Sequence, residues 1–168
     1  MLVWGRGQED KIKFAPERRD LADIILTNMS IFKDTADKKE ISVNFTQIGN
    51  SKAFFDKDLM DIIIRNLLSN AIKYTERGGR ISILLKDGSL TSEGIILKIC
   101  DNGVGIPAKK QKNLFTSAEI ESTPGTENEK GTGFGLKLCS ELIKINNGTI
   151  SVQSQVDEGT CFTISLPG

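Results

Sequence analysis

Mostly apolar residues recur at helical spacing in three separate stretches of the chain, and this pattern predicts three amphipathic helices. The first helix follows Pro16, a residue suited to a first helical turn, and ends near residues 33–37. The second follows Asp56, a suitable N-cap, and runs to about Tyr74. The third spans 133–146. The residues that carry this spacing are Leu21, Ile24, Ile25, Asn28, Met29 and Phe32, then Leu59, Met60, Ile63, Leu67, Leu68 and Ala71, and finally Phe134, Leu138, Cys139, Leu142 and Ile145.

Alternating apolar and polar residues, together with short apolar runs, predict six strands between and after these helices. Gly49 marks a turn after the first of them, and the polar stretch around Gly88 suits a hairpin loop. The predicted strands cover residues 41–45, 53–55, 80–86, 94–100, 149–156 and 161–166. Segregated helices and antiparallel hairpins indicate an α+β protein, with one mixed, mostly antiparallel sheet covered on one face by three helices.

Composition narrows the possible functions. The 168 residues suit one domain, and 22 Lys plus Arg balance 22 Asp plus Glu, so no basic excess points to nucleic acid. The chain has no histidine, which excludes a histidine general base, a histidine-ligated metal and a phosphohistidine of its own. Because no apolar run approaches the roughly 18 residues of a membrane span, we expect a soluble cytoplasmic domain without direct membrane contact. Whether a parent protein is membrane-anchored stays open.

The three cysteines do not form a recognisable motif. Cys100, Cys139 and Cys161 are widely spaced and odd in number, and no pair has the spacing of a zinc or redox motif. We therefore expect buried, reduced thiols rather than a disulfide framework.

The second predicted helix carries a polar stripe. Asn66, Asn70, Lys73 and Arg77 follow one another at steps of four, three and four residues, which places them on one side of a helix. A solvated helix face would explain this stripe. Asparagines are poor helix formers, however, and isoleucines flank the stripe, so it could equally line a cavity.

Two glycine-rich segments are candidates for ligand binding. Asp101 follows an apolar strand directly and precedes Gly103 and Gly105, either as an ordinary turn or as a carboxylate placed to accept a hydrogen bond from adenine N6. Residues 131–135 open the third helix, where backbone N–H groups suit a phosphate or form a hinge. Between them, residues 116–130 lack periodicity, which is typical of a lid or a disordered insert.

In this order, the segments resemble the catalytic ATP-binding domain of sensor histidine kinases, in the superfamily shared with DNA gyrase and the heat-shock chaperones. The resemblance covers about Lys11 to Pro167 and implies a Bergerat-type ATP-binding fold, a two-layer α/β sandwich. The matching motifs, in chain order, are the N box at Asn66–Thr75, the first glycine box at Asp101–Pro107, the second glycine box at Gly131–Leu136 and the last motif at Gly159–Thr160.

The resemblance implies a role for each matching residue. Asn70 would coordinate Mg²⁺ through its amide oxygen, because the triphosphate of ATP supplies most of the charge. Asp101 would bind adenine N6, with Thr160 supporting it through water. Tyr74 would pack on the adenine, and Lys73 would approach the phosphates.

The remaining implied contacts come from the glycine boxes and the lid. Backbone N–H groups of the second glycine box would hold the phosphates, Ile106 and Leu136 would be apolar walls, and Lys130 is the one lid cation available for the γ-phosphate. The implied nucleotide-binding residues are Asn70, Lys73, Tyr74, Asp101, Gly103, Gly105, Ile106, Lys130, Gly131, Thr132, Gly133, Phe134, Gly135, Leu136 and Thr160.

Asn66 distinguishes subfamilies within the resemblance. Gyrase-like and chaperone-like hydrolases carry a glutamate four residues before the Mg²⁺ asparagine, and here that position is Asn66. An amide cannot take a proton from water, which disfavours hydrolysis, whereas a neutral histidine acceptor needs no such base. We therefore assign Asn66 and Lys73 to the catalytic group of a phosphotransferase.

The lid departs from the family pattern. Phe115 matches the first phenylalanine of the family's phenylalanine box, but Ala118 takes the place of the second. The lid glutamates are Glu119, Glu121, Glu127 and Glu129. We expect a weakly anchored lid over 116–130 that is mobile without nucleotide.

The leading hypothesis is a kinase domain that binds Mg·ATP and phosphorylates a histidine on a separate dimerisation domain, which in turn serves a response regulator. Residues 1–10, with the isolated apolar Leu2, Val3 and Trp4, resemble the end of that dimerisation domain's last helix, and 11–168 form the catalytic domain, expected to be monomeric alone. The alternative is a nucleotide-dependent regulator or pseudokinase without transfer activity.

Overall fold

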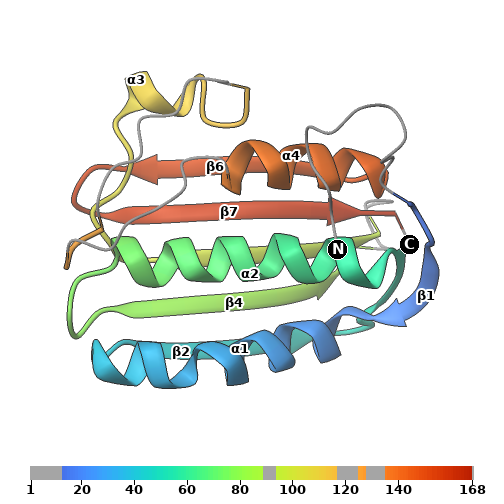
Figure 1. Ribbon diagram of the computed structural model, residues 1–168, viewed down its shortest axis with the longest axis horizontal. Coiled ribbons are helices and arrows are strands. Elements are labelled where there is room, and N and C mark those ends of the chain that lie inside the picture. Colours follow the sequence, from blue (N-terminus) through green and yellow to red (C-terminus); the bar gives the residue numbers. More distant parts are fainter. Residues whose placement is uncertain (1–12, 89–93, 117–124, 128–134, 168) are drawn as a thin grey trace.

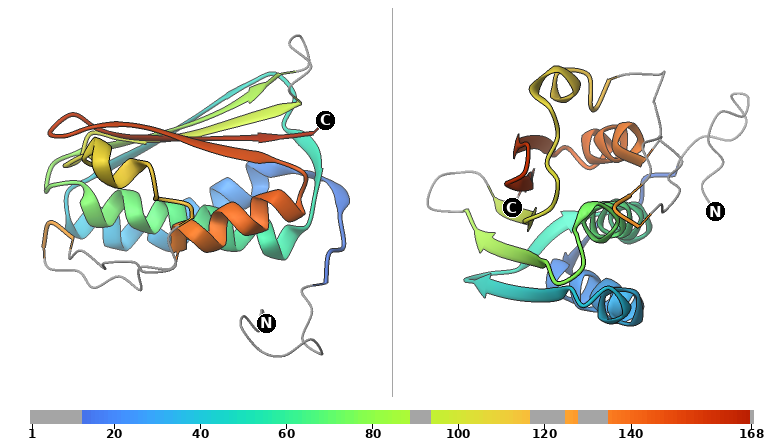
Figure 2. Two further views of the ribbon diagram at one scale, coloured as in Figure 1. Left: turned by 90° about the horizontal axis from the view of Figure 1, so that it is seen from above. Right: turned by 90° about the vertical axis from the view of Figure 1, so that its left-hand side faces the viewer.

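The computed structural model describes residues 13–88, 94–116, 125–127 and 135–167. Its main sheet has five strands, and α1, α2 and α4 pack against one face of it (Figures 1 and 2). The strand order is β2-β4-β5-β7-β6, with β2 and β4 parallel and the other neighbours antiparallel. The predicted α+β architecture, a mixed sheet with three helices on one face, is confirmed.

The strands of this sheet are β2 (Ser42–Ile48), β4 (Arg80–Asp87), β5 (Ile95–Asp101), β6 (Thr149–Gln155) and β7 (Gly159–Leu166). The helices are α1 (Leu21–Lys38), α2 (Lys57–Tyr74), a short α3 (Ala108–Gln111) and α4 (Gly135–Ile145). Alternate strand residues such as Ile99 and Phe162 are buried beneath the helices. None of the helices in the described ranges combines the length and hydropathy that a membrane span requires.

The central helix α2 is defined at both ends by side-chain caps. Asp56 accepts a hydrogen bond from the Leu59 N–H at 3.1 Å, as the sequence predicts for an N-cap. At the other end the backbone turns extended at Thr75, whose buried hydroxyl donates to the Ala71 carbonyl at 2.6 Å. The apolar stripe of α2 fills the core between the sheet and the neighbouring helices. Its buried residues include Leu59, Met60, Ile63, Ile64, Leu67, Leu68, Ala71 and Ile72.

The prediction for the start of the first helix is wrong by several residues. Residues Glu17–Asp20 form a strand, β1, antiparallel to β3 (Lys52–Phe55), and α1 begins only at Leu21 with Asp20 as its N-cap. β3 therefore belongs to a separate two-stranded sheet and not to the main one. A pairing between segments so far apart in the chain leaves no local pattern from which it could be predicted.

The predicted polar stripe keeps only three of its four residues on the helix. α2 ends at Tyr74, so Arg77 lies beyond the helix and turns toward α1, while Asn66, Asn70 and Lys73 stay on the helix. The cause is the extended conformation at Thr75, which interrupts the helical spacing that placed Arg77 on the same side.

The expectation of reduced thiols is wrong for two of the three cysteines. Cys100 of β5 and Cys161 of β7 lie opposite one another in the sheet and form a disulfide. They are 61 residues apart in sequence, so only the pairing of β5 with β7 brings them together. Cys139 is free and buried as expected, and burial raises the pKa of its thiol to about 12, so the thiolate is not populated at neutral pH.

Candidate functional site

Three predicted site residues remain together on one side of α2. Asn66 and Asn70 are half-buried, and Lys73 is buried, with its ammonium group 4.8 Å from the centre of the Tyr74 ring. This distance suits a cation–π contact between the Lys73 ammonium group and the Tyr74 ring. The neighbouring α2 residues therefore present two amides, one cation and one aromatic ring at the C-terminal half of the helix.

The start of α4 packs directly on Asn66. A Cβ placed on Gly135 would lie 3.0 Å from the Asn66 side-chain oxygen, so the two segments are in contact. The Asn66 amide group donates to the Ile62 carbonyl of its own helix at 2.9 Å, which fixes its orientation. The described end of the second glycine box thus lies beside the N box.

The first glycine box lies against the C-terminal end of α2. The Val104 N–H donates to the Tyr74 carbonyl at 3.1 Å, and the Gly103 N–H donates to the Asp101 carboxylate at 2.9 Å. A Cβ on Gly103 would overlap the Tyr74 carbonyl, so only glycine permits this approach. The contact brings Asp101 and Tyr74, the two residues predicted to recognise adenine, to one corner of the molecule.

Gly105 offers a test of this packing. It has φ of +75°, and a Cβ there would overlap the backbone oxygen of Gln155. We expect Gly105→Ala to lower the free energy of unfolding by roughly 1–3 kcal/mol more than Gly78→Ala does. Gly78 is a matched control because its φ is +83° but its Cβ would meet nothing within 4 Å. Chemical denaturation of both variants measures the difference, and equal losses would show that the close approach to Gln155 costs nothing.

Asp101 has an unusual environment for a carboxyl group. Burial raises its pKa from 3.8 to about 6, and hydrogen bonds from the backbone of Gly103 and Thr160 partly offset that rise. The group is therefore ionised at neutral pH but less strongly solvated than a surface aspartate. A charged acceptor in a partly dry site suits recognition of an N–H donor such as an exocyclic amine.

Two further residues hold this corner together and were not predicted from the sequence. The Ser154 hydroxyl accepts from the Ile106 N–H at 2.8 Å, donates to the Gly159 carbonyl at 2.9 Å and lies 2.8 Å from the Thr160 hydroxyl. Gln111 donates to the Ile106 carbonyl at 2.7 Å and to the Ser154 carbonyl at 2.9 Å. A serine in an alternating strand and a glutamine in a short helix give no signal of such roles in the sequence.

The predicted apolar walls, Ile106 and Leu136, are both half-buried and pack on the core. Phe115, the one phenylalanine-box residue present, makes an edge-to-face contact with Phe162, with the ring centres 6.2 Å apart. Several other predicted features lie outside the described residues. They are the remnant at 1–10, the lid positions Ala118, Glu119, Glu121, Glu129 and Lys130, and the glycine-box residues Gly131, Thr132, Gly133 and Phe134.

The donor groups among the described residues suit Mg²⁺ best as an ion shared with a ligand. Within the described ranges, no three His, Cys, Asp or Glu side chains gather closely enough to hold a metal by themselves. Asn70 supplies one neutral oxygen, which suits a hard cation whose other ligands are phosphate oxygens and water. The residues therefore fit an ion that arrives with a nucleotide better than one that the protein binds alone.

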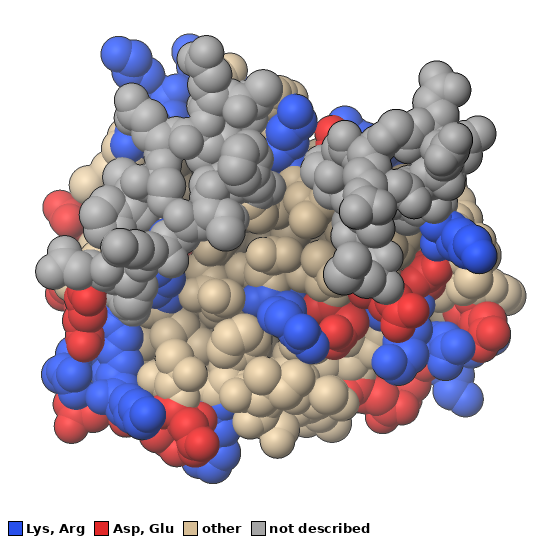
Figure 3. Space-filling model, in the orientation of Figure 1, with Lys and Arg blue, Asp and Glu red and all other residues tan. Residues whose placement is uncertain are grey.

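The uncovered part of the surface on the helix side of the molecule carries charges of both signs. In the part of this face that Figure 3 leaves uncovered, Lys and Arg lie among Asp and Glu along the lower and right-hand edges, and uncharged residues fill most of the middle. An anionic ligand would therefore depend on local hydrogen-bond geometry and not on a broad positive field.

Comparisons with known proteins identify relatives of this chain. A family described as "Histidine kinase-, DNA gyrase B-, and HSP90-like ATPase" matches residues 55–168. The adaptive-response sensory kinase SasA of Parasynechococcus marenigrum is 31% identical over 156 residues, which are 92% of this chain and 40% of that protein. The chain thus spans about two fifths of the length of this relative.

Solved structures share the fold. The catalytic domain of the histidine kinase ThkA superposes with a TM-score of 0.75 at 23% identity, covering 93% of this chain and 96% of that one. Full-length ShkA, solved in complex with AMPPNP, superposes with a TM-score of 0.76 at 19% identity, covering 93% and 32% of the two chains.

Proposed function

The chain belongs to the family of histidine kinase-, DNA gyrase B- and HSP90-like ATPases, and we therefore propose that it binds Mg·ATP and transfers the γ-phosphoryl group to a histidine on a separate dimerisation domain. The observation that carries this proposal is the corner where Asp101 and its glycine turn lie against Tyr74, with Asn66 and Gly135 in contact farther along α2. This corner offers an adenine acceptor, an aromatic surface and a helix start for phosphates in one continuous arrangement. ShkA, which has the same fold, was solved in complex with an ATP analogue, and this supports ATP as the proposed ligand.

In this proposal each residue has a distinct task. Asp101 accepts a hydrogen bond from adenine N6, and Tyr74 packs on the base. Lys73 offers positive charge to the phosphates, and the N-terminal turn of α4 offers backbone N–H groups and the positive end of its dipole. Asn70 would hold Mg²⁺ through its amide oxygen, and that ion would neutralise charge on the phosphates.

The transfer step requires little acid–base chemistry from this chain. An unprotonated imidazole nitrogen of the acceptor forms a bond to the γ-phosphorus while the bond from that phosphorus to the β–γ bridging oxygen breaks, and ADP leaves. No water needs to be deprotonated in this reaction. Asn66 supports transfer over hydrolysis for this reason, because its amide cannot act as a base and is already hydrogen-bonded to Ile62.

A transfer assay tests the proposal. The chain is mixed with the histidine-bearing dimerisation fragment of its parent and with ATP labelled at the γ-phosphate. We expect acid-labile label on the fragment, and none on a fragment whose histidine is replaced. Bound nucleotide with no label on the histidine would instead favour the alternative, a regulatory or pseudokinase module. Release of labelled phosphate into solution at a high rate would favour an ATPase of the gyrase type.

The finer expectations remain part of this proposal. Mg²⁺ as the required ion, a response regulator as the final phosphate acceptor and a cytoplasmic location are all consistent with a domain of a sensory kinase such as SasA. Each concerns the whole protein, of which this chain would be one domain.

A further inference from the structure

Residues Gly125–Glu127 contact the C-terminal end of α2, and we propose that Thr126 is a positioning residue that anchors this part of the predicted lid beside Lys73 and Tyr74. The inference rests on the proposed nucleotide site, because it concerns how Lys73 and Tyr74 of that site are held in position. The sequence did not indicate what would anchor the predicted lid, because Ala118 replaces the second phenylalanine of the phenylalanine box.

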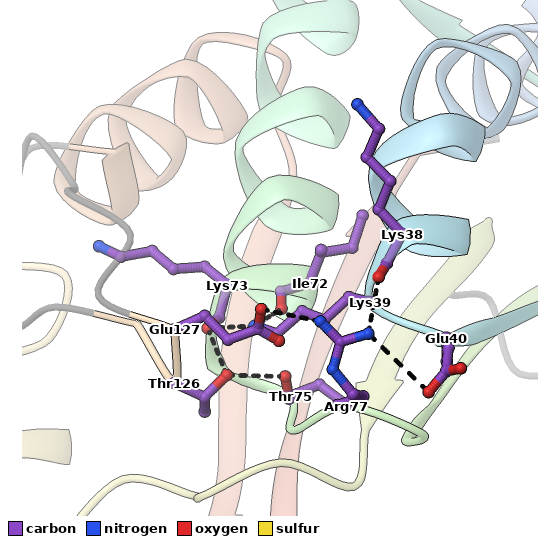
Figure 4. Close-up of polar contacts among 9 residues, drawn as sticks. All are labelled: Lys38, Lys39, Glu40, Ile72, Lys73, Thr75, Arg77, Thr126 and Glu127. Atoms are coloured by element: carbon purple, nitrogen blue, oxygen red, sulfur yellow. Dashed lines mark hydrogen bonds and ion pairs between the residues drawn. The ribbon is translucent and has the colours of Figure 1, made fainter.

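The backbone of Thr126 is bound to α2 on the spot where the helix ends. Its N–H donates to the Lys73 carbonyl at 3.0 Å, and its hydroxyl donates to the Thr75 carbonyl at 3.0 Å (Figure 4). These two carbonyls flank Tyr74 in the chain. A displacement of the 125–127 segment would therefore break hydrogen bonds to the backbone on both sides of Tyr74.

One of the two carbonyls that accept from Thr126, the Lys73 carbonyl, is also bound by a buried lysine. Lys39 is only 4% exposed, and its ammonium group donates to the Ile72 carbonyl at 2.9 Å and to the Lys73 carbonyl at 3.1 Å. A cation at a helix C-terminus also satisfies the negative end of the helix dipole. Lys39, the residue that follows α1, thus helps to fix the position of the Lys73 carbonyl that accepts from Thr126.

An ion pair beside Thr126 extends the anchor. Arg77 contacts Glu127 at 3.2 Å, and its other guanidinium nitrogen donates to the Lys38 carbonyl at 2.9 Å and lies 3.8 Å from Glu40. All of these groups are well exposed, so the pair adds only modest energy. Its geometry nevertheless explains what Arg77 does outside the polar stripe: it ties the 125–127 segment to the end of α1.

The anchor is distinct from the other attachment visible in the described residues, the contact of Phe115 with Phe162 on β7. Phe115 lies just before the predicted lid and contacts β7, whereas Thr126 lies 11 residues later and contacts the end of α2.

Substitution of Thr126 tests the proposal. Thr126→Val keeps the shape of the side chain but removes the hydroxyl donor, and Thr126→Ser keeps the donor. With a fluorescent ATP analogue and Mg²⁺, we expect Thr126→Val to weaken binding by roughly 3- to 10-fold through faster dissociation, the size of one lost hydrogen bond, and Thr126→Ser to bind like the wild type. Glu127→Gln added to Thr126→Val should weaken binding by less than a further 3-fold.

A structural role alone would give a different result. If Thr126 only supports folding, Thr126→Val would lower the thermal midpoint and leave the nucleotide dissociation rate of the folded protein unchanged, and this outcome would overturn the proposal. Equal weakening by Thr126→Ser would also contradict it. Failure of the wild-type chain to bind the analogue would instead refute the proposed function, so the two failures are distinguishable.

Discussion

Replacing Asn70 with alanine is expected to weaken binding of Mg·ATP by roughly 100-fold, which is the loss typical for removal of a group that orders a bound metal. Asn70 is half-buried on α2. Among the described residues, no group of three His, Cys, Asp or Glu side chains could bind the metal in its place. The effect should depend on the ion. In the presence of a chelator the wild type and the variant should bind nucleotide with similar, low affinity, and isothermal titration calorimetry measures all four combinations.

Asn44→Ala is a suitable control for this experiment. Asn44 is an exposed asparagine on β2, and its replacement should change neither the affinity nor its dependence on Mg²⁺. If Asn70→Ala binds Mg·ATP as tightly as the wild type, Asn70 is not the metal ligand. A uniform loss with and without Mg²⁺ would mean that the side chain contacts the nucleotide itself.

Asp101→Asn is expected to make the protein more stable and to bind nucleotide less well. The pKa of Asp101 is raised to about 6 by burial, so the folded state binds a proton more readily than the unfolded state does. Stability therefore falls as pH rises from about 4 to 6 and stays lower above that range. Removing the charge should raise the free energy of unfolding at pH 7.5 by roughly 1–2 kcal/mol, with no gain near pH 3.5.

The same substitution should weaken nucleotide binding by roughly 10- to 100-fold at pH 7.5, because a hydrogen bond to a charged acceptor is lost. The wild type should itself lose affinity as pH falls through about 6, and the variant should not. Denaturation and binding measured across pH 3.5–8 test both parts. Asp34→Asn, at an exposed position of α1, is the control that should move neither quantity. A variant that is less stable at pH 7.5 would contradict the burial argument.

The combination of these two effects would identify Asp101 as a functional residue. A carboxylate that costs stability and yet is needed for binding is typical of a site, where the environment serves a ligand and not the fold. An ordinary turn aspartate would show the opposite behaviour, with stability lost on substitution and binding unchanged.

Local chemistry was enough to predict the architecture and to select the candidate site residues. Asp56 predicted the start of α2 because an N-cap acts within one helical turn, and helical or alternating periodicity marked the faces that pack on the sheet. The order of the motifs, from Asn66 through Asp101 to Gly135, was equally readable. These features depend on neighbours along the chain, so the sequence contains them directly.

Long-range pairing determined the rest, and no local pattern encodes it. The strand β1 forms only because β3 lies beside it, and Cys100 meets Cys161 only because β5 pairs with β7. Arg77 leaves the helical stripe because the backbone is extended at Thr75. Ser154 and Thr126 join the site through contacts with residues about 50 positions away. The sequence by itself determined which residues are candidates for the proposed nucleotide site, whereas the tertiary structure decided which groups hold those residues in place, because hydrogen bonds between distant segments exist only once the chain has folded.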